Sequence, residues 1–204
     1  MMQTMSLRLA AVAALAVIGT TTAQAEAFNG AYAGLSVGLD NYEVKGSDVF
    51  AIGDAYDGLS GNGASVGAYL GYDLPIGSGA FVGAEAFVDT SGAKLRYDDT
   101  ADAFSLKARE SYGISTRIGA KVNDSTGLYA RLGWQQTRFK GELNGFADST
   151  TEDGWRYGAG IETSLGSNVA LRLEYSIVDY GSAGTAGVLD VKNGQLKTGV
   201  SLRF

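Results

Sequence analysis

Hydrophobic and polar residues alternate along most of the chain beyond residue 26. Successive side chains of an extended strand point to opposite faces, so this alternation predicts strands with one apolar and one polar face. In the first segment the apolar members stand at every second position: Ala31, Ala33, Leu35, Val37 and Leu39. The pattern predicts an all-β protein with eight strands, roughly at residues 31–40, 63–74, 82–89, 104–122, 128–137, 155–165, 169–177 and 196–204.

The connections between these segments alternate between long and short. The long ones cover residues 44–62, 92–103, 140–154 and 180–190, and the short ones cover 75–79, 123–127 and 166–168. Outer-membrane barrels have an even number of antiparallel strands, joined by short periplasmic turns and longer extracellular loops. We therefore expect an eight-stranded antiparallel up-and-down transmembrane β-barrel with both termini on the periplasmic side.

The polar face of the predicted strands is rich in glycine. Glycines at this face are Gly67, Gly71, Gly83, Gly113, Gly119, Gly133, Gly158, Gly160 and Gly199. A closed eight-stranded barrel has an interior barely wide enough for side chains, and crowding favours small residues there. This composition favours a polar interior and an apolar, lipid-facing exterior. The alternative is a soluble secreted ligand-binding barrel, like a lipocalin, with its apolar face inward.

Charged residues also recur on the inferred interior face. They are Glu85, Arg117, Arg131, Arg156, Glu162, Arg172, Glu174, Lys197 and Arg203. An unpaired ion in a low-dielectric lumen is costly, so we expect these acids and bases to pair into a network. Such a network would plug a narrow barrel. The alternative is a small-solute porin or gated narrow channel, in which ion pairs exchange partners to open a path for water or ions.

The first 25 residues differ in kind from the rest. Arg8 precedes an apolar run over residues 9–18, and Ala23-Gln24-Ala25 supplies the small residues that a signal peptidase reads. The run is shorter than the roughly 20 residues that a helix needs to span a bilayer. We predict a cleaved signal peptide at residues 1–25 and one outer-membrane β-barrel domain at residues 26–204.

Composition narrows the chemistry further. The chain has no cysteine and no histidine, and its net charge is −6. Without histidine it lacks the usual general base, the usual zinc ligand and the central member of a Ser-His-Asp triad. An acidic chain is also a poor partner for nucleic acid, which requires clustered Lys and Arg. We predict that the protein is not an enzyme, and we assign no catalytic, cofactor-binding or metal-binding residue and no cofactor.

The first long connection carries an acidic and aromatic cluster: Asp48, Phe50, Asp54, Tyr56 and Asp57. The cluster could bind a host surface or a cation, but its spacing lacks the ligand order of a calcium loop, which favours a solvated loop. The other expected partners are outer-membrane lipid and lipopolysaccharide.

Three segments carry a family resemblance: residues 154–162, 171–181 and 199–204. The chain resembles the alphaproteobacterial small outer-membrane β-barrel family, the opacity-like and OmpA-like transmembrane-domain proteins often called porin family proteins. The resemblance implies an eight-stranded barrel, with Phe204 as the C-terminal signal for the barrel-assembly machinery. We therefore expect an integral outer-membrane protein with a structural role in the envelope and surface loops available for adhesion or host contact.

Overall fold

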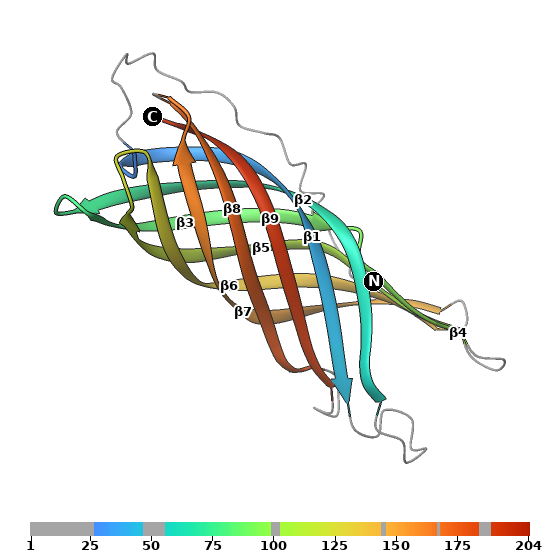
Figure 1. Ribbon diagram of the computed structural model, residues 1–204. Helices are drawn as coiled ribbons and strands as arrows, with labels where there is room; N and C mark the ends of the chain where they lie inside the picture. The colour runs from blue at the N-terminus through green and yellow to red at the C-terminus, as the bar shows by residue number, and fades with distance from the viewer. Residues whose placement is uncertain (1–26, 47–55, 99–102, 144–145, 167, 184–188) are drawn as a thin grey trace, which may run out of the picture.

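The computed structural model is a closed antiparallel β-barrel (Figure 1). It describes residues 27–46, 56–98, 103–143, 146–166, 168–183 and 189–204. The strands are β1 (Gly30–Gly46), β2 (Tyr56–Ile76), β3 (Ala80–Ser91), β4 (Lys94–Asp98), β5 (Ala103–Lys121), β6 (Thr126–Leu143), β7 (Phe146–Ser164), β8 (Val169–Ala183) and β9 (Leu189–Arg203). β3 and β4 both pair with β5 and are separated only by Gly92 and Ala93. Together they form one barrel strand, which confirms the predicted eight-stranded barrel.

The barrel closes where the last strand pairs with the first. Tyr32 on β1 lies opposite Arg203 on β9, and the amide of Phe204 donates a hydrogen bond of 2.9 Å to the carbonyl of Ala31. The turn after β2 reverses within Gly77, Ser78 and Gly79, and Gly77 has a φ of 63°, which glycine adopts without strain. The short connections, the start of β1 and the end of β9 therefore lie at one end of the barrel, which we call the short-turn end. The predicted signal peptide, residues 1–25, lies outside the described residues.

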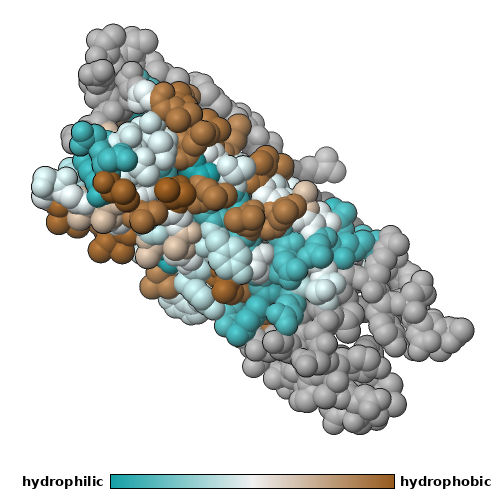
Figure 2. Space-filling model, in the orientation of Figure 1, coloured by the Kyte–Doolittle hydropathy of each residue, from teal (hydrophilic) through white to brown (hydrophobic). Residues whose placement is uncertain are grey.

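The exterior of the barrel is apolar in the half that includes the short-turn end. Its exposed side chains include Leu35, Leu39, Val66, Leu70, Leu74, Ile114, Ile118, Leu132, Trp155, Leu173, Val200 and Phe204. In Figure 2 hydrophobic residues gather over one end of the visible face, and hydrophilic residues lie toward the other end. The charged side chains of the same strands point inward and are buried. A soluble barrel with an apolar interior is therefore the wrong interpretation, because this exterior matches lipid.

The strands continue far past the positions where the sequence pattern predicted loops. β6 and β7 remain paired from Thr126 opposite Thr163 to Leu143 opposite Phe146, so most of the predicted loop at 140–154 is a hairpin of strand. The predicted loops at 44–62, 92–103 and 180–190 are likewise shortened by strand. Asp48, Phe50 and Asp54 lie outside the described residues. No helix in the described ranges is long and apolar enough to cross a membrane.

A bulge in β5 corrects one predicted face. Regular alternation over the predicted strand at 104–122 places Ala108 outside with Tyr112, and Arg109 inside. The structure buries Ala108 and exposes Arg109, because the three-residue step from Ala108 to Ser111 lies opposite a two-residue step from Phe139 to Thr137. One extra residue in a strand shifts the alternation by one position, which exchanges the two faces.

In the part of the barrel farthest from the short-turn end, the interior is less polar than in the middle of the barrel. Far from that end the lumen is filled by a cluster of buried apolar and aromatic residues: Tyr42, Ala93, Ala108, Phe139, Val178, Tyr180 and Val191. We call this set the aromatic cap. Lys140 and Arg138 flank Phe139 on the exposed face of β6. Above the apolar band, the barrel is therefore built like a water-soluble one.

Candidate functional site

The lumen below the aromatic cap holds a charge network. Six buried acidic and six buried basic side chains point into it, which we call the lumen network: Asp40, Asp73, Glu85, Asp89, Glu162, Glu174, Arg117, Arg131, Arg156, Arg172, Lys197 and Arg203. They come from all eight strands of the barrel, with β3 and β4 counted as one strand. The formal charges of the set balance.

The part nearest the short-turn end is organised by Arg117. Its Nε lies 2.8 Å from Oδ1 of Asp73, and a second hydrogen bond to Asp73 completes a bidentate pair. Its Nη1 lies 2.8 Å from Oε2 of Glu162. Arg203 bridges the same two acids, donating to Asp73 at 2.9 Å and also to Glu162. Charge-assisted, forked hydrogen bonds of this kind are stronger and more directional than neutral ones.

Arg172 links this group to the middle of the lumen. Its Nη2 lies 3.0 Å from Oε2 of Glu162, and its Nη1 lies 2.7 Å from Oε2 of Glu85. Glu85 also accepts a hydrogen bond of 2.9 Å from the hydroxyl of Tyr32. Its other oxygen pairs with Arg131 at 2.7 Å. Glu85 is therefore shared by two arginines and a tyrosine.

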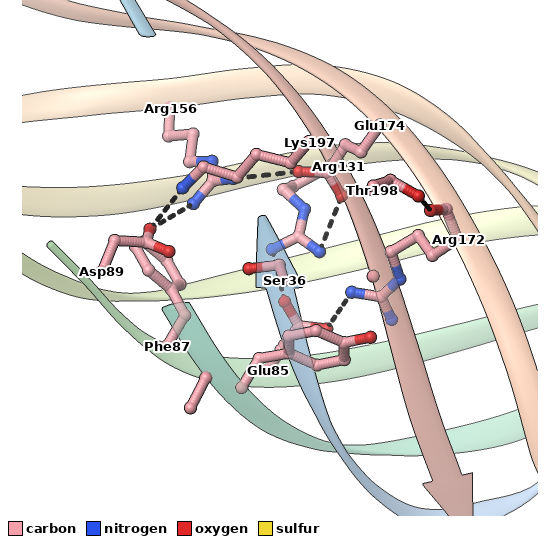
Figure 3. Close-up of a pocket in the computed structure, with 13 residues that line it drawn as sticks. Ser36, Glu85, Phe87, Asp89, Arg131, Arg156, Arg172, Glu174, Lys197 and Thr198 are labelled. Atoms are coloured by element: carbon pink, nitrogen blue, oxygen red, sulfur yellow. Dashed lines mark hydrogen bonds and ion pairs between the residues drawn. The ribbon is translucent and has the colours of Figure 1, made fainter. Parts of the chain in front are cut away.

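The pairing continues toward the aromatic cap (Figure 3). Arg131 Nη2 lies 2.9 Å from Oε2 of Glu174, and Arg156 Nη2 lies 3.0 Å from Oε1 of the same carboxylate. Asp89 then pairs with Lys197 at 2.5 Å and, more loosely, with Arg156 at 3.8 Å. The pairs thus form one continuous chain of alternating charge from Arg203 to Lys197.

Aromatic rings pack between the arginines. The Arg172 guanidinium lies 4.4 Å from the ring centre of Tyr69, Arg156 lies 4.5 Å from that of Phe87, and Arg117 lies 4.6 Å from that of Tyr32. Cations over aromatic faces gain electrostatic energy, most of all where water is excluded. A Cβ at Gly71 would collide with the Tyr32 ring, so this lumen glycine makes room for a ring from the neighbouring strand.

Both ends of the network are capped by aromatic residues. At the short-turn end Phe28 stacks on Phe81, with ring centres 4.5 Å apart. At the other end Phe139 contacts Tyr42 and Tyr180 edge to face, at 5.7 and 5.5 Å. Burial raises the pKa of the Tyr180 phenol to about 12, since the phenolate would be desolvated. A cavity of about 20 Å³ lies between the caps, beside Glu85, Arg131 and other network residues, and it has room for about one water molecule.

The structure brings together the nine charged residues from which the sequence predicted a network. Arg109, which regular alternation also placed on the inner face, is exposed instead. Sequence reasoning did not include Asp40, Asp73 and Asp89 in the network, although it had placed all three on the polar face. A signal for them was present: the nine expected residues comprise three acids and six bases. A sealed lumen does not tolerate such an excess, so further acids on the same face were required.

The network acids are poorly suited to proton transfer. Glu85, Glu162 and Glu174 each accept hydrogen bonds or ion pairs from at least two basic side chains. The arrangement favours structural pairing over acid–base chemistry.

Comparisons with known proteins agree with this architecture. Outer membrane protein A of Serratia marcescens is 28% identical over 209 residues, which cover 96% of this chain and 55% of that protein. Outer membrane protein A of Klebsiella pneumoniae is 28% identical over 184 residues, covering 85% of this chain and 50% of that protein. The chain therefore spans about half the length of these curated relatives.

Two solved structures share the fold. Neisserial surface protein A aligns with a TM-score of 0.51 and 22% identity, covering 83% of this chain and 97% of that chain. The attachment invasion locus protein Ail of Yersinia pestis aligns with a TM-score of 0.50 and 20% identity, covering 86% of this chain and 99% of that chain. The sequence also matches the family described as outer membrane protein beta-barrel domain over residues 10–204. The chain therefore belongs to this family and is an integral protein of the outer membrane.

Proposed function

We propose that the protein is a closed structural barrel of the envelope, which presents the ends of its extended strands for adhesion or host contact. The observation that carries the proposal is the filling of the lumen. Balanced ion pairs occupy it at the level of the apolar band, and aromatic residues cap it at both ends. A lumen in which most charges are held by two or more partners resists rearrangement, because removing one partner from a buried pair is strongly unfavourable.

Planar-bilayer recording tests this proposal. Purified full-length protein, refolded and inserted at high protein load, should produce no steady conductance. Glu85→Gln leaves Arg131 and Arg172 short of a carboxylate and should produce brief openings at most. Glu110→Gln, at an exposed position outside the lumen, serves as the matched control and should leave the bilayer silent.

Large, steady conductance of the unaltered protein would overturn the structural role and favour a small-solute porin. Discrete openings that disappear or change in size when Glu85 or Arg131 is neutralised would instead favour the gated narrow channel. Insertion is verified in the same samples by the heat-dependent shift in gel mobility that closed barrels show, so a silent bilayer is not confused with failed insertion.

The proposal includes export, assembly and the absence of enzyme activity. Residues 1–25 would direct export and be removed before Glu26. The barrel-assembly machinery would recognise the end of the chain, where Leu196, Val200 and Leu202 on β9 and the following Phe204 are exposed. The protein would have no catalytic activity, which is supported by the absence of histidine from the sequence and by the multiple basic partners of the lumen glutamates.

A further inference from the structure

Three lysines lie in direct cross-strand register on the outside of the barrel. Lys94 on β4 is opposite Lys107 on β5, and Lys107 is opposite Lys140 on β6. Their inward-facing neighbours Ala93 and Ala108 belong to the aromatic cap, so the lysines face outward. Like charges directly opposite each other on a sheet are destabilising. We call these three residues the lysine row.

Two arginines extend the positive surface. Arg109 lies in the β5 bulge and Arg138 lies two positions before Lys140, and both are exposed. Glu110 shares the bulge, but no ion pair joins it or another acid to these five cations within the described ranges. Adjacent strands are about 4.8 Å apart, so the lysine row spans roughly 10 Å.

A second row of three charged residues in cross-strand register, on β1, β9 and β8, has a different order of charges. There Lys192 on β9 lies opposite Glu43 on β1 and opposite Asp179 on β8, which gives the order acid, base, acid. Lys192 Nζ lies 3.4 Å from Oδ2 of Asp179. The chain therefore neutralises charge in cross-strand register at this site and leaves it uncompensated at the lysine row.

The lysine row lies just beyond the lipid-facing band. Outward apolar positions run from Val122, just after β5, back to Tyr112 on β5, a stretch of eleven residues, and a tilted membrane strand needs about 9 to 11. Tyr112 and Trp134 pack edge to face at 6.4 Å, and Trp155 lies opposite Trp134, so aromatic residues mark the end of the band. The cations follow directly along β5 and β6. They are therefore at the height of the outer-leaflet headgroups.

We propose that the lysine row, with Arg109 and Arg138, binds the phosphate groups of the phosphorylated glycolipid of the outer leaflet. The inference rests on the proposed function in that it requires the barrel to be inserted in the outer membrane. Phosphate oxygens would screen the three aligned ammonium groups, and each forked guanidinium group would donate two hydrogen bonds to a phosphate. The acyl chains of the same lipid would pack on Ile114 and Leu132 below. One lipid molecule would therefore contact β5 and β6 with both its acyl chains and its phosphate groups.

The test compares two forms of the same lipid. Full-length protein in detergent micelles is titrated with bisphosphorylated lipid A and with fully dephosphorylated lipid A, and bound lipid is counted by native mass spectrometry. The unaltered protein should prefer the phosphorylated form. The variant K94Q/K107Q/K140Q should lose about a hundredfold in affinity for it, at about fivefold for each lysine. K192Q, which removes a lysine from the compensated row, should change the affinity less than twofold.

Several results would overturn the inference. Equal binding of both lipid forms by the unaltered protein is one such result, and it needs no variant to observe. A loss of affinity in K192Q as large as that of the triple variant is another. Binding of soluble heparin that depends on the three lysines, without preference for phosphorylated lipid, would assign the row to a soluble polyanion instead. The heat-dependent mobility shift is measured on every sample. A protein that shows the shift without phosphate preference contradicts this inference alone, whereas a protein that neither shifts nor inserts into vesicles contradicts the proposed function.

Discussion

The two halves of the barrel differ in which side of the same strands is charged. At the level of the apolar band, β6 points Arg131 inward and Leu132 outward. Further along the same strand, Phe139 points inward and Arg138 and Lys140 point outward. β8 repeats the change, from Arg172 and Glu174 inside to Val178 and Tyr180 inside. The backbone alternation continues while the polarity of its two faces is exchanged.

The difference shows that the surroundings of the barrel determine what fills its lumen. In lipid the exterior must be apolar, so polar groups gather inside, where they must pair. Beyond the lipid the exterior meets water, and the lumen is filled mainly by apolar and aromatic side chains, which gain free energy from burial. One chain thus combines a membrane barrel and a soluble barrel end to end. The two halves should respond differently to substitution.

The largest effect is expected in the charged half. Glu162 holds Arg117, Arg172 and Arg203, so Glu162→Gln leaves an excess positive charge among three buried guanidinium groups. We expect the free energy of unfolding to fall by about 3 to 5 kcal/mol. Urea unfolding from lipid vesicles, followed by the fluorescence of Trp134 and Trp155, measures it.

A second substitution tests whether charge balance is the cause. Adding Arg203→Met to Glu162→Gln removes one guanidinium and should recover part of the lost stability, although the two residues are 41 positions apart in sequence. Glu110→Gln, at an exposed position, should change stability by less than about 0.5 kcal/mol. If the double variant is no more stable than Glu162→Gln alone, charge balance does not explain the network.

A smaller and more local effect is expected in the aromatic cap. Phe139→Ala removes the ring that contacts both Tyr42 and Tyr180 and should cost about 3 kcal/mol. Amide hydrogen exchange should accelerate at the far ends of β6 and β8 and remain slow around Arg131. Arg138→Gln, the outward neighbour, should have little effect. Equal acceleration throughout the barrel would contradict the division into two halves.

The smallest effect is a pH dependence confined to the cap. The pKa of Tyr180 is raised from 10.0 to about 12 by burial. The unfolded chain therefore loses the phenol proton first as pH rises, and the stability contributed by the neutral phenol is complete below pH 10 and is lost as pH passes through about 12. At pH 11 the loss should be about 1 kcal/mol. Urea unfolding of the unaltered protein and of Tyr180→Phe, each below pH 10 and at pH 11, measures this loss. An identical pH dependence in the variant would contradict the assignment to Tyr180.

Most of the barrel was predictable from local alternation, and the errors have a common origin. The strand ending at residue 137 and the strand ending at 177 were predicted to stop where their apolar positions change phase. In the structure both strands continue, and Phe139 and Val178 are the first inward apolar residues after the change. Where the apolar positions move from the outward to the inward face, the alternation looks as if it ends when the whole exterior of the barrel is assumed to meet the same solvent. The bulge at Arg109 produced the other error, because a single inserted residue also exchanges the faces.

The candidate site was predictable by face but not by partner. Arg117, Glu162 and the seven other expected residues are all buried in the lumen. Which acid each base binds depends on the register of the closed barrel, and sequence spacing carries no information on that register. Asp73 illustrates this, since its partner Arg203 is 130 positions away and reaches it only because β9 closes on β1.

By itself, the sequence determined that this protein is a barrel of eight alternating strands with glycine and charge on one face, because a period of two is a local property of extended backbone. Only the tertiary structure decided where along each strand that charged face passes from the lumen to the outside, and which charges meet. Both depend on the closure of the barrel, which brings distant strands together and sets one part of each strand against lipid and another against water.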